Sequence, residues 1–207
     1  MKLLTKITMF FMIGLMPINL AHAAEKTDLD NAKIYVTTIS KQTITLLQDE
    51  SIAASDKMNK MYAVLEDTMA YDVIGRIVLG KPYRGLTDDQ KSEYDVLFKE
   101  YLLTKYSSLV GSYNGQDVEI TKSVRAGKAD AMVFTKIGVP GQEGIVVGWR
   151  IRTIKGEMKL LDVKIADLSM VQTERDQFQN VYQNHKIDGI LKALRSLTEK
   201  MQAKRQS

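Results

Sequence analysis

The chain has 207 residues, of which 44% are hydrophobic and 26% charged; it has a formal net charge of +4, three prolines and no cysteine. This composition excludes a disordered or collagen-like chain, and the lack of cysteine excludes disulfides, zinc–thiolate sites, iron–sulfur clusters and a thiol nucleophile. The length suits one domain with a substantial core, and the small excess of positive charge gives no indication of nucleic-acid binding.

The N-terminus has the pattern of an export signal. A basic start with Lys2 and Lys6 precedes a short apolar stretch, and Ala21-His22-Ala23 then gives the small–x–small pattern that signal peptidase cleaves. We therefore expect residues 1–23 to be a signal peptide and residues 24–207 to form a single domain. An exported chain without cysteine fits a bacterial periplasm.

The first half of the predicted domain has the period of amphipathic helices. Apolar residues recur every three or four positions in four stretches, at residues 29–46, 58–69, 71–79 and 94–109. Gly80 is typical of the end of the third helix, and Pro82 prevents its continuation. Thr87 and Gln90 form a capping box that opens the fourth helix, which we expect to end at Gly111.

The second half changes to the alternation that is typical of strands. Four alternating stretches separated by turns occupy residues 118–121, 131–137, 145–152 and 160–165, and two amphipathic segments follow near 173–182 and 187–201. This order predicts an α+β fold, in which a four-stranded antiparallel meander packs on a layer of helices. Helices that line one sheet face without filling it would leave an apolar cavity there.

The predicted strand at residues 160–165 is relevant to an alternative hypothesis, that the protein is an enzyme. Its alternation places Leu161 and Val163 on the apolar face, and it places Asp162 on the opposite face in an exposed pair with Arg150 or Arg152. A small hydrolase or isomerase would instead need a carboxylate or a histidine at the floor of its pocket.

Histidine is scarce, which limits the possible chemistry further. After signal cleavage only His185 remains, in a polar stretch between the last two predicted helices, and we expect it at the surface. The sequence contains no His-x-x-x-His, no G-x-S-x-G and no glycine-rich phosphate loop. We therefore expect a protein that is not an enzyme and that uses neither a metal nor a cofactor.

Short motifs along the predicted domain carry a family resemblance. They include Asp72, Val78-Leu79-Gly80, Tyr83-Arg84, Val147-Gly148-Trp149-Arg150-Ile151, residues 156–163, Asp167-Leu168-Ser169 and Asp188-Gly189-Ile190-Leu191. This ordered set resembles the MlaC family of periplasmic phospholipid-binding proteins. The resemblance implies a carrier that shuttles phospholipid between an outer-membrane lipoprotein–porin complex and an inner-membrane ABC transporter with an MCE-domain subunit, and so maintains outer-membrane lipid asymmetry.

The resemblance also implies a site, with acyl chains between the apolar sheet face and the helices. Near its mouth, Arg84 is the first candidate for the phosphate headgroup and Lys81 the second. The same apolar pattern also fits an ordinary packed core. The expected wall residues are Leu79, Phe98, Leu102, Tyr106 and Leu109 from the helices, and Val147, Trp149, Ile151, Leu161 and Val163 from the strands.

Three alternatives to a phospholipid carrier remain at this point. The first is a periplasmic carrier or binding module for another apolar ligand, such as an isoprenoid, a sterol-like or a quinone-like molecule. The second is the small hydrolase or isomerase considered above. The third is a structural adaptor with a filled interior and no ligand.

Overall fold

The computed structural model describes residues 26–108, 116–138 and 143–206. The expected signal peptide and Leu109 lie outside these ranges. The described elements are α1 (Leu29–Gln48), α2 (Ala54–Thr68), α3 (Tyr71–Leu79), η1 (Lys81–Gly85), α4 (Asp88–Ser107), β1 (Asp117–Ala126), β2 (Asp130–Gly138), β3 (Ile145–Ile154), β4 (Glu157–Ile165), β5 (Leu168–Ser169) and α5 (Met170–Gln206).

The strands form one antiparallel sheet in the order β1-β2-β3-β4-β5. The predicted α+β fold and its meander are therefore confirmed, with five strands in place of four. The additional strand, Leu168–Ser169, has two residues, which is too short to produce an alternating pattern in the sequence.

A β-bulge interrupts the alternation predicted for β4 at Leu160 and Leu161, whereas Asp162 and Val163 keep their predicted faces. Ile151 pairs with Leu160, while the preceding residue of β3 pairs with Asp162, so Leu161 has no partner of its own in the register. One extra residue reverses which side chains face each side of the sheet. Consequently Leu160 and Val163 pack in the same apolar cluster, although the alternation predicts them on opposite faces.

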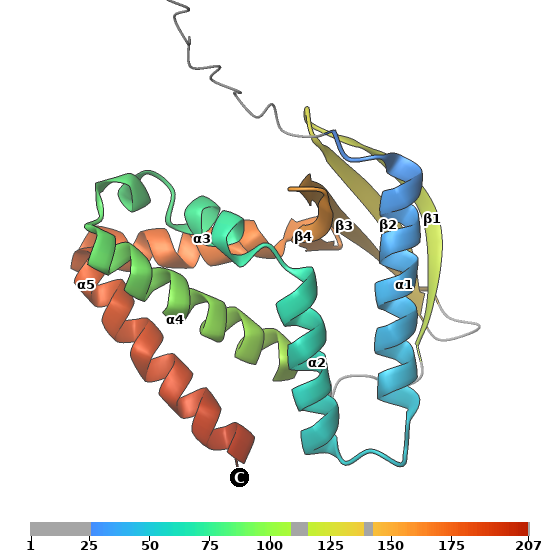
Figure 1. The fold of residues 1–207 in the computed structure, drawn as a ribbon, viewed down its shortest axis with the longest axis horizontal. Helices are drawn as coiled ribbons and strands as arrows, with labels where there is room; N and C mark the ends of the chain where they lie inside the picture. Colours follow the sequence, from blue (N-terminus) through green and yellow to red (C-terminus); the bar gives the residue numbers. More distant parts are fainter. Residues whose placement is uncertain (1–25, 109–115, 139–142, 207) are drawn as a thin grey trace, which may run out of the picture.

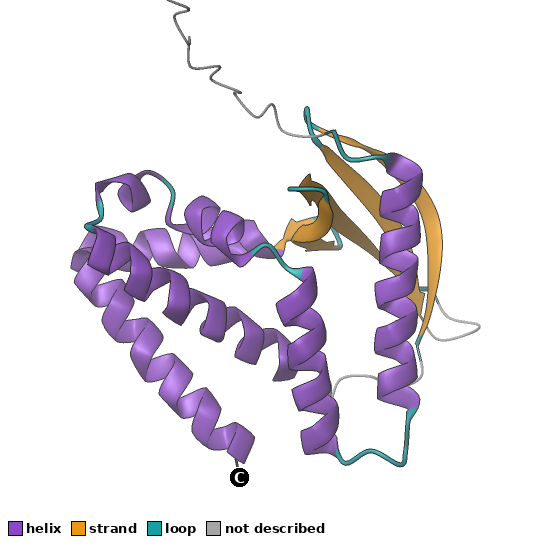
Figure 2. Cartoon of the chain, in the orientation of Figure 1, coloured by secondary structure: helices purple, strands orange, loops and turns teal. Residues whose placement is uncertain are grey.

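The molecule has two apolar clusters, one at the sheet and one among the helices. At the sheet, Ala32 and Val36 of α1 pack on Ala131, Val133 and Ile151. Among the helices, α3, α4 and α5 enclose a separate aromatic-rich core. Figures 1 and 2 show α1 along the sheet, α3, α4 and α5 in a second group, and α2 between them.

Local sequence signals explain how several helices begin and end. Thr87 and Gln90 make the predicted reciprocal capping box, with N···O distances of 3.2 and 3.1 Å. Gly80 follows α3 with a φ of 66°, in the left-handed region that favours glycine. The two predicted C-terminal helices are present as the two limbs of α5, which meet at a sharp kink at Lys186, whose φ is 54°. None of the described helices combines the length and the apolar composition that crossing a membrane requires.

Candidate functional site

An apolar cavity of about 240 Å³ lies between α1, α2 and the sheet. Its surface is formed by carbon atoms, although five of the residues around it carry polar groups. The lining residues are Ile39, Ser40, Thr43, Ile44 and Leu47 from α1, Met61, Val64, Leu65 and Thr68 from α2, and Gln116, Val118, Ile137, Trp149 and Leu160 from the sheet and the residue before it.

Hydrogen bonds within the wall turn two of these polar groups away from the cavity. The hydroxyl of Thr68 donates to the carbonyl of Val64 at 2.8 Å, and Trp149 Nε1–H donates to Thr135 Oγ1 at 2.9 Å. Ser40 Oγ is buried and has no hydrogen-bond partner among the described residues. The wall therefore presents hydrocarbon to whatever occupies the cavity.

Of the wall residues expected from the sequence, Trp149 lines this cavity. Ile151 and Val163 belong to the sheet cluster beside it. Val147 and the bulge residue Leu161 are buried, and neither is among the lining residues.

The helical residues expected in the wall lie elsewhere. Leu79, Phe98 and Leu102 are buried in the core between α3, α4 and α5, where Phe98 stacks against Tyr94 with 5.4 Å between ring centroids. Tyr106 packs against the same core. The structure thus does not bring these four residues to the cavity.

The cavity walls from α1 and α2 were missed because both helices resemble ordinary amphipathic helices in sequence. The apolar stripe of α1 continues through Ile39, Ile44 and Leu47, but its fully buried residues, Ala32 and Val36, lie in its first half. Only the structure shows that the second half of the stripe borders a hollow.

The two headgroup candidates are exposed on η1. Figure 1 shows this short helix beyond α3, at the end of the helical group far from α1. Arg84 and Lys81 therefore do not lie at the cavity between α1, α2 and the sheet. Their expected role rests on the family resemblance alone.

Asp162 of β4, which was expected in an exposed ion pair, is buried beneath the first turn of α5. Its Oδ2 accepts from Ser169 Oγ at 2.6 Å and its Oδ1 accepts from Val171 N at 3.0 Å. Asp162 lies across from Arg150 in the register, as the alternation predicts, but the expected exposed ion pair is wrong because β5 and the first turn of α5 cover this carboxylate. Both carboxylate oxygens act in holding β4 to α5, and Asp162 does not line the cavity.

The partner of both arginines is instead Asp130, at the start of β2. Arg150 Nε and Arg152 Nε each lie 2.6 Å from an oxygen of its carboxylate, which is 1% exposed. The neighbouring strands present these three side chains on the sheet face opposite α1, since Ala131 and Ile151 of the same strands pack on α1. Two guanidinium groups compensate one buried carboxylate.

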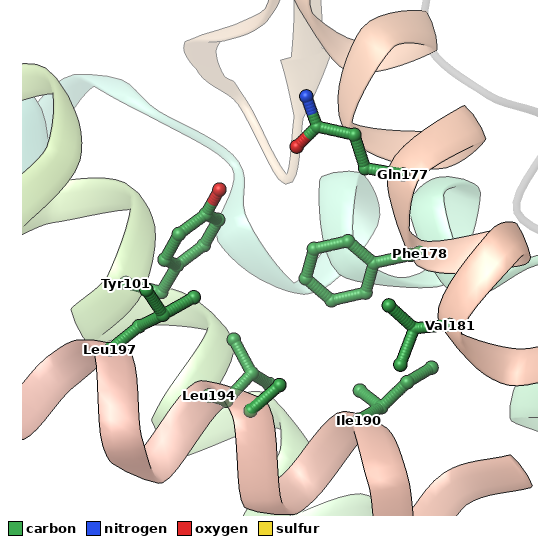
Figure 3. A pocket seen from close by; sticks show the side chains of 8 residues that line it. Tyr101, Gln177, Phe178, Val181, Ile190, Leu194 and Leu197 are labelled. Carbon is green, nitrogen blue, oxygen red and sulfur yellow. The ribbon is translucent and has the colours of Figure 1, made fainter. Parts of the chain in front are cut away.

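A second, smaller hollow of about 110 Å³ lies between α4 and the two limbs of α5 (Figure 3). Phe178 and Val181 approach it from the first limb, and Ile190 and Leu194 from the second. Its remaining lining residues are Tyr101, Gln177, Ala193 and Leu197.

Beside this hollow, a buried polar cluster joins α4 to α5. Glu174, which is 1% exposed, accepts from Tyr101 OH at 2.9 Å and from Tyr106 OH at 3.2 Å, and it forms an ion pair with Lys105. Burial alone would lower the pKa of Lys105, but its bonds to Glu174 and Tyr101 raise that pKa overall. The cluster fixes the two helices against each other.

In the described part of the chain, no three His, Asp or Glu side chains are grouped so as to hold a metal ion.

Together, the fold and the cavity define an α+β protein built around an apolar hollow, the arrangement of a protein that binds apolar ligands. Residues 37–196 match the family described as MlaC protein, and the chain belongs to this family. It is also similar to a solved structure, the phospholipid-binding protein from Ralstonia solanacearum in complex with a phospholipid. That similarity has a TM-score of 0.70 at 16% sequence identity and covers 82% of this chain and 98% of the other, which establishes a shared fold.

Proposed function

We propose that this protein is a periplasmic phospholipid carrier that holds acyl chains between α1, α2 and the sheet. The observation that carries the proposal is the carbon-lined cavity of about 240 Å³ between these elements. Membership of the MlaC family supports it, as does the shared fold with the phospholipid-binding protein from Ralstonia solanacearum.

The hydrophobic effect explains why a carrier is needed. A diacyl lipid buries on the order of 30 methylene groups, and at ~0.8 kcal/mol each its exposure to water costs about 24 kcal/mol. Spontaneous crossing of an aqueous gap is therefore very slow. A dry cavity removes most of this barrier, and because the bilayer is equally apolar, loading and release stay nearly balanced.

The size of the cavity sets a condition on loading. Sites for small molecules usually measure about 300–1,000 Å³, and this cavity is smaller. Entry of two acyl chains therefore requires α1 and α2 to move away from the sheet. Such a movement loosens the contacts of Ala32 and Val36 with the sheet, whereas the aromatic core between α3, α4 and α5 can stay packed.

The wider role follows from the family and is part of the proposal. Residues 1–23 act as the signal peptide, and the exported domain accepts and delivers phospholipid in the periplasm. Its partners are the outer-membrane lipoprotein–porin complex and the inner-membrane ABC transporter with an MCE-domain subunit. The lipid traffic maintains outer-membrane asymmetry.

Extraction of the purified protein tests the proposal. The full chain is exported in a Gram-negative host, purified without detergent and extracted with organic solvent, and the extract is analysed by mass spectrometry. We expect about one phospholipid per protein, as one cavity of this kind implies. An isoprenoid, sterol-like or quinone-like molecule in place of phospholipid would contradict the proposed ligand, and an empty extract would contradict a carrier.

A further inference from the structure

The only tryptophan of the chain, Trp149, lies in the cavity wall, and its indole N–H forms a hydrogen bond within the sheet. It donates to Thr135 Oγ1 at 2.9 Å, across from β3 to β2. Thr135 is 0% exposed, and its hydroxyl lies 3.4 Å from the carbonyl oxygen of Val147, to which it donates. The hydroxyl proton is thus directed at Val147, which leaves an oxygen lone pair for the indole.

This arrangement decides which part of the indole meets a ligand. An indole N–H is a donor with no acceptor capacity, and a buried donor without a partner is strongly disfavoured. Because Thr135 accepts this proton inside the sheet, the ring presents carbon to the cavity. The cavity surface is accordingly apolar at Trp149.

We propose that Thr135 is a specificity-determining residue, which makes the cavity select plain hydrocarbon chains by sequestering the N–H of Trp149. Thr135 acts through Trp149 and is a positioning residue. This inference rests on the proposed function, since it specifies which acyl chains the same cavity accepts. Chains that carry a polar oxygen are rejected because, with the indole N–H sequestered and Ser40 Oγ buried, the wall exposes no polar atom that could replace the hydrogen bonds lost on leaving water.

Substitution of Thr135 changes whether the indole N–H of Trp149 has an acceptor within the sheet. In Thr135→Val the shape is nearly kept but the acceptor is lost, so the indole N–H has no partner in the sheet and becomes available to a ligand in the cavity. A ligand with a mid-chain carbonyl then gains a donor. Thr135→Ser retains the hydroxyl and is the matched control, and Thr135→Cys, whose sulfur is a weak acceptor, serves as a second test if the valine variant does not fold.

The first measurement follows the indole directly. A chain with one tryptophan has one indole N–H signal in NMR, and its hydrogen-exchange rate reports the bond to Thr135. We expect exchange about tenfold faster in Thr135→Val, since a net hydrogen bond is worth about 1 kcal/mol or slightly more, and near the wild-type rate in Thr135→Ser. An unchanged rate in Thr135→Val and Thr135→Cys would overturn the inference.

The second measurement compares two diacyl phospholipids of equal chain length, one plain and one with a ketone in the middle of a chain. We expect the wild type and Thr135→Ser to prefer the plain lipid, and we expect that preference to fall roughly tenfold in Thr135→Val. In a Trp149→Phe background, which lacks the N–H, Thr135→Val should leave the preference unchanged. Binding of the plain lipid with the same preference in all variants would overturn the inference alone, whereas binding of neither lipid by the wild type would overturn the proposed function as well.

Discussion

Val64 offers a direct test of the cavity at the scale of a single residue. It lies on α2 and lines the cavity, so Val64→Phe places a ring in the space proposed for acyl chains. Because overpacking costs about 1–3 kcal/mol, we expect roughly tenfold less lipid in the extract of this variant. The measurement is the amount of phospholipid per folded protein, by solvent extraction and mass spectrometry.

Val96 supplies the matched control, since it is 67% exposed on α4. The same substitution there, Val96→Phe, adds the same ring on the surface, and the lipid content should stay at the wild-type level. Equal lipid content in the two variants would show that the chains are bound somewhere other than beside Val64.

Residue identity alone separates a cavity wall from a packed core poorly. Trp149 and Phe98 were expected in one wall on equal grounds, but Trp149 borders the cavity while Phe98 is enclosed by aromatic rings of α4 and α5. Both side chains are apolar and both follow the period of their element. What distinguishes them is which helix lies opposite, and that depends on contacts between residues distant in sequence.

Among the elements, the break in α5 depends on a glycine. A Cβ built on Gly189 would lie 2.1 Å from His185 Cβ, because the chain folds back on itself around Lys186. We expect Gly189→Ala to destabilise the protein by about 1–3 kcal/mol, measured by urea unfolding. Gly85→Ala, where no atom lies within 4 Å of the added Cβ, should change stability by less than about 0.5 kcal/mol. Similar losses in both variants would contradict a steric origin.

The junction between β4 and α5 depends on Asp162. Removal of its carboxylate in Asp162→Ala leaves Val171 N and Ser169 Oγ without their acceptor. We expect a loss of about 1–3 kcal/mol of stability by urea unfolding, with the lipid content per folded protein unchanged. Asp188→Ala, at an exposed position on α5, is the control and should be nearly neutral. Loss of a measurable turnover in Asp162→Ala at normal stability would instead favour the hydrolase alternative.

Short-range sequence signals predicted where the elements begin and end. The features that were not predicted depend on contacts between residues distant in sequence. The capping box at Thr87 and the helix end at Gly80 involve residues a few positions apart, so the sequence shows them directly. The bulge at Leu161 arises from the pairing of two strands and leaves no mark in the composition of β4. The bulge therefore changes the face of Leu160, whereas Asp162 keeps its predicted place across from Arg150 and is buried there by the first turn of α5.

For the molecule as a whole, alkaline pH is expected to reduce stability. Burial first, and then the negative charges of Asp67 and Glu157, raise the pKa of Tyr35 from 10.0 to about 12. Because the folded protein holds this proton more tightly than the unfolded chain, the contribution of Tyr35 is complete below pH 10 and is lost as the pH rises through about 12.

Urea unfolding at a series of pH values between about 8 and about 12 measures this loss. We expect the free energy of unfolding to fall over the upper half of the series, and to fall less in Tyr35→Phe, which has no hydroxyl to ionise. Burial also raises the pKa of Tyr71 and the pKa of Tyr94, so part of the decrease should remain in that variant. Identical curves for the wild type and Tyr35→Phe would contradict the raised pKa.

The overall architecture and a cavity against the sheet were predictable, whereas the helices that complete the cavity wall were not. The change from helical to alternating period marks the α+β class in the sequence, and the family match and the shared fold agree with it. The sequence does not reveal that the helices divide into a packed group and a pair, α1 and α2, that borders a hollow. Every one of these helices has an apolar face, so the sequence pattern is the same for both groups. The division depends on tertiary contacts between residues that are distant in sequence.

Quenching of Trp149 by a labelled lipid tests most directly whether acyl chains occupy the cavity beside α1, α2 and the sheet. The protein, which contains one tryptophan, is loaded with a phospholipid that carries bromine atoms in the middle of its chains, and fluorescence is compared with an unlabelled load. We predict strong quenching that saturates at about one lipid per protein, because the indole lies in the cavity wall. Stoichiometric binding of the brominated lipid without any loss of Trp149 fluorescence would contradict the proposed site.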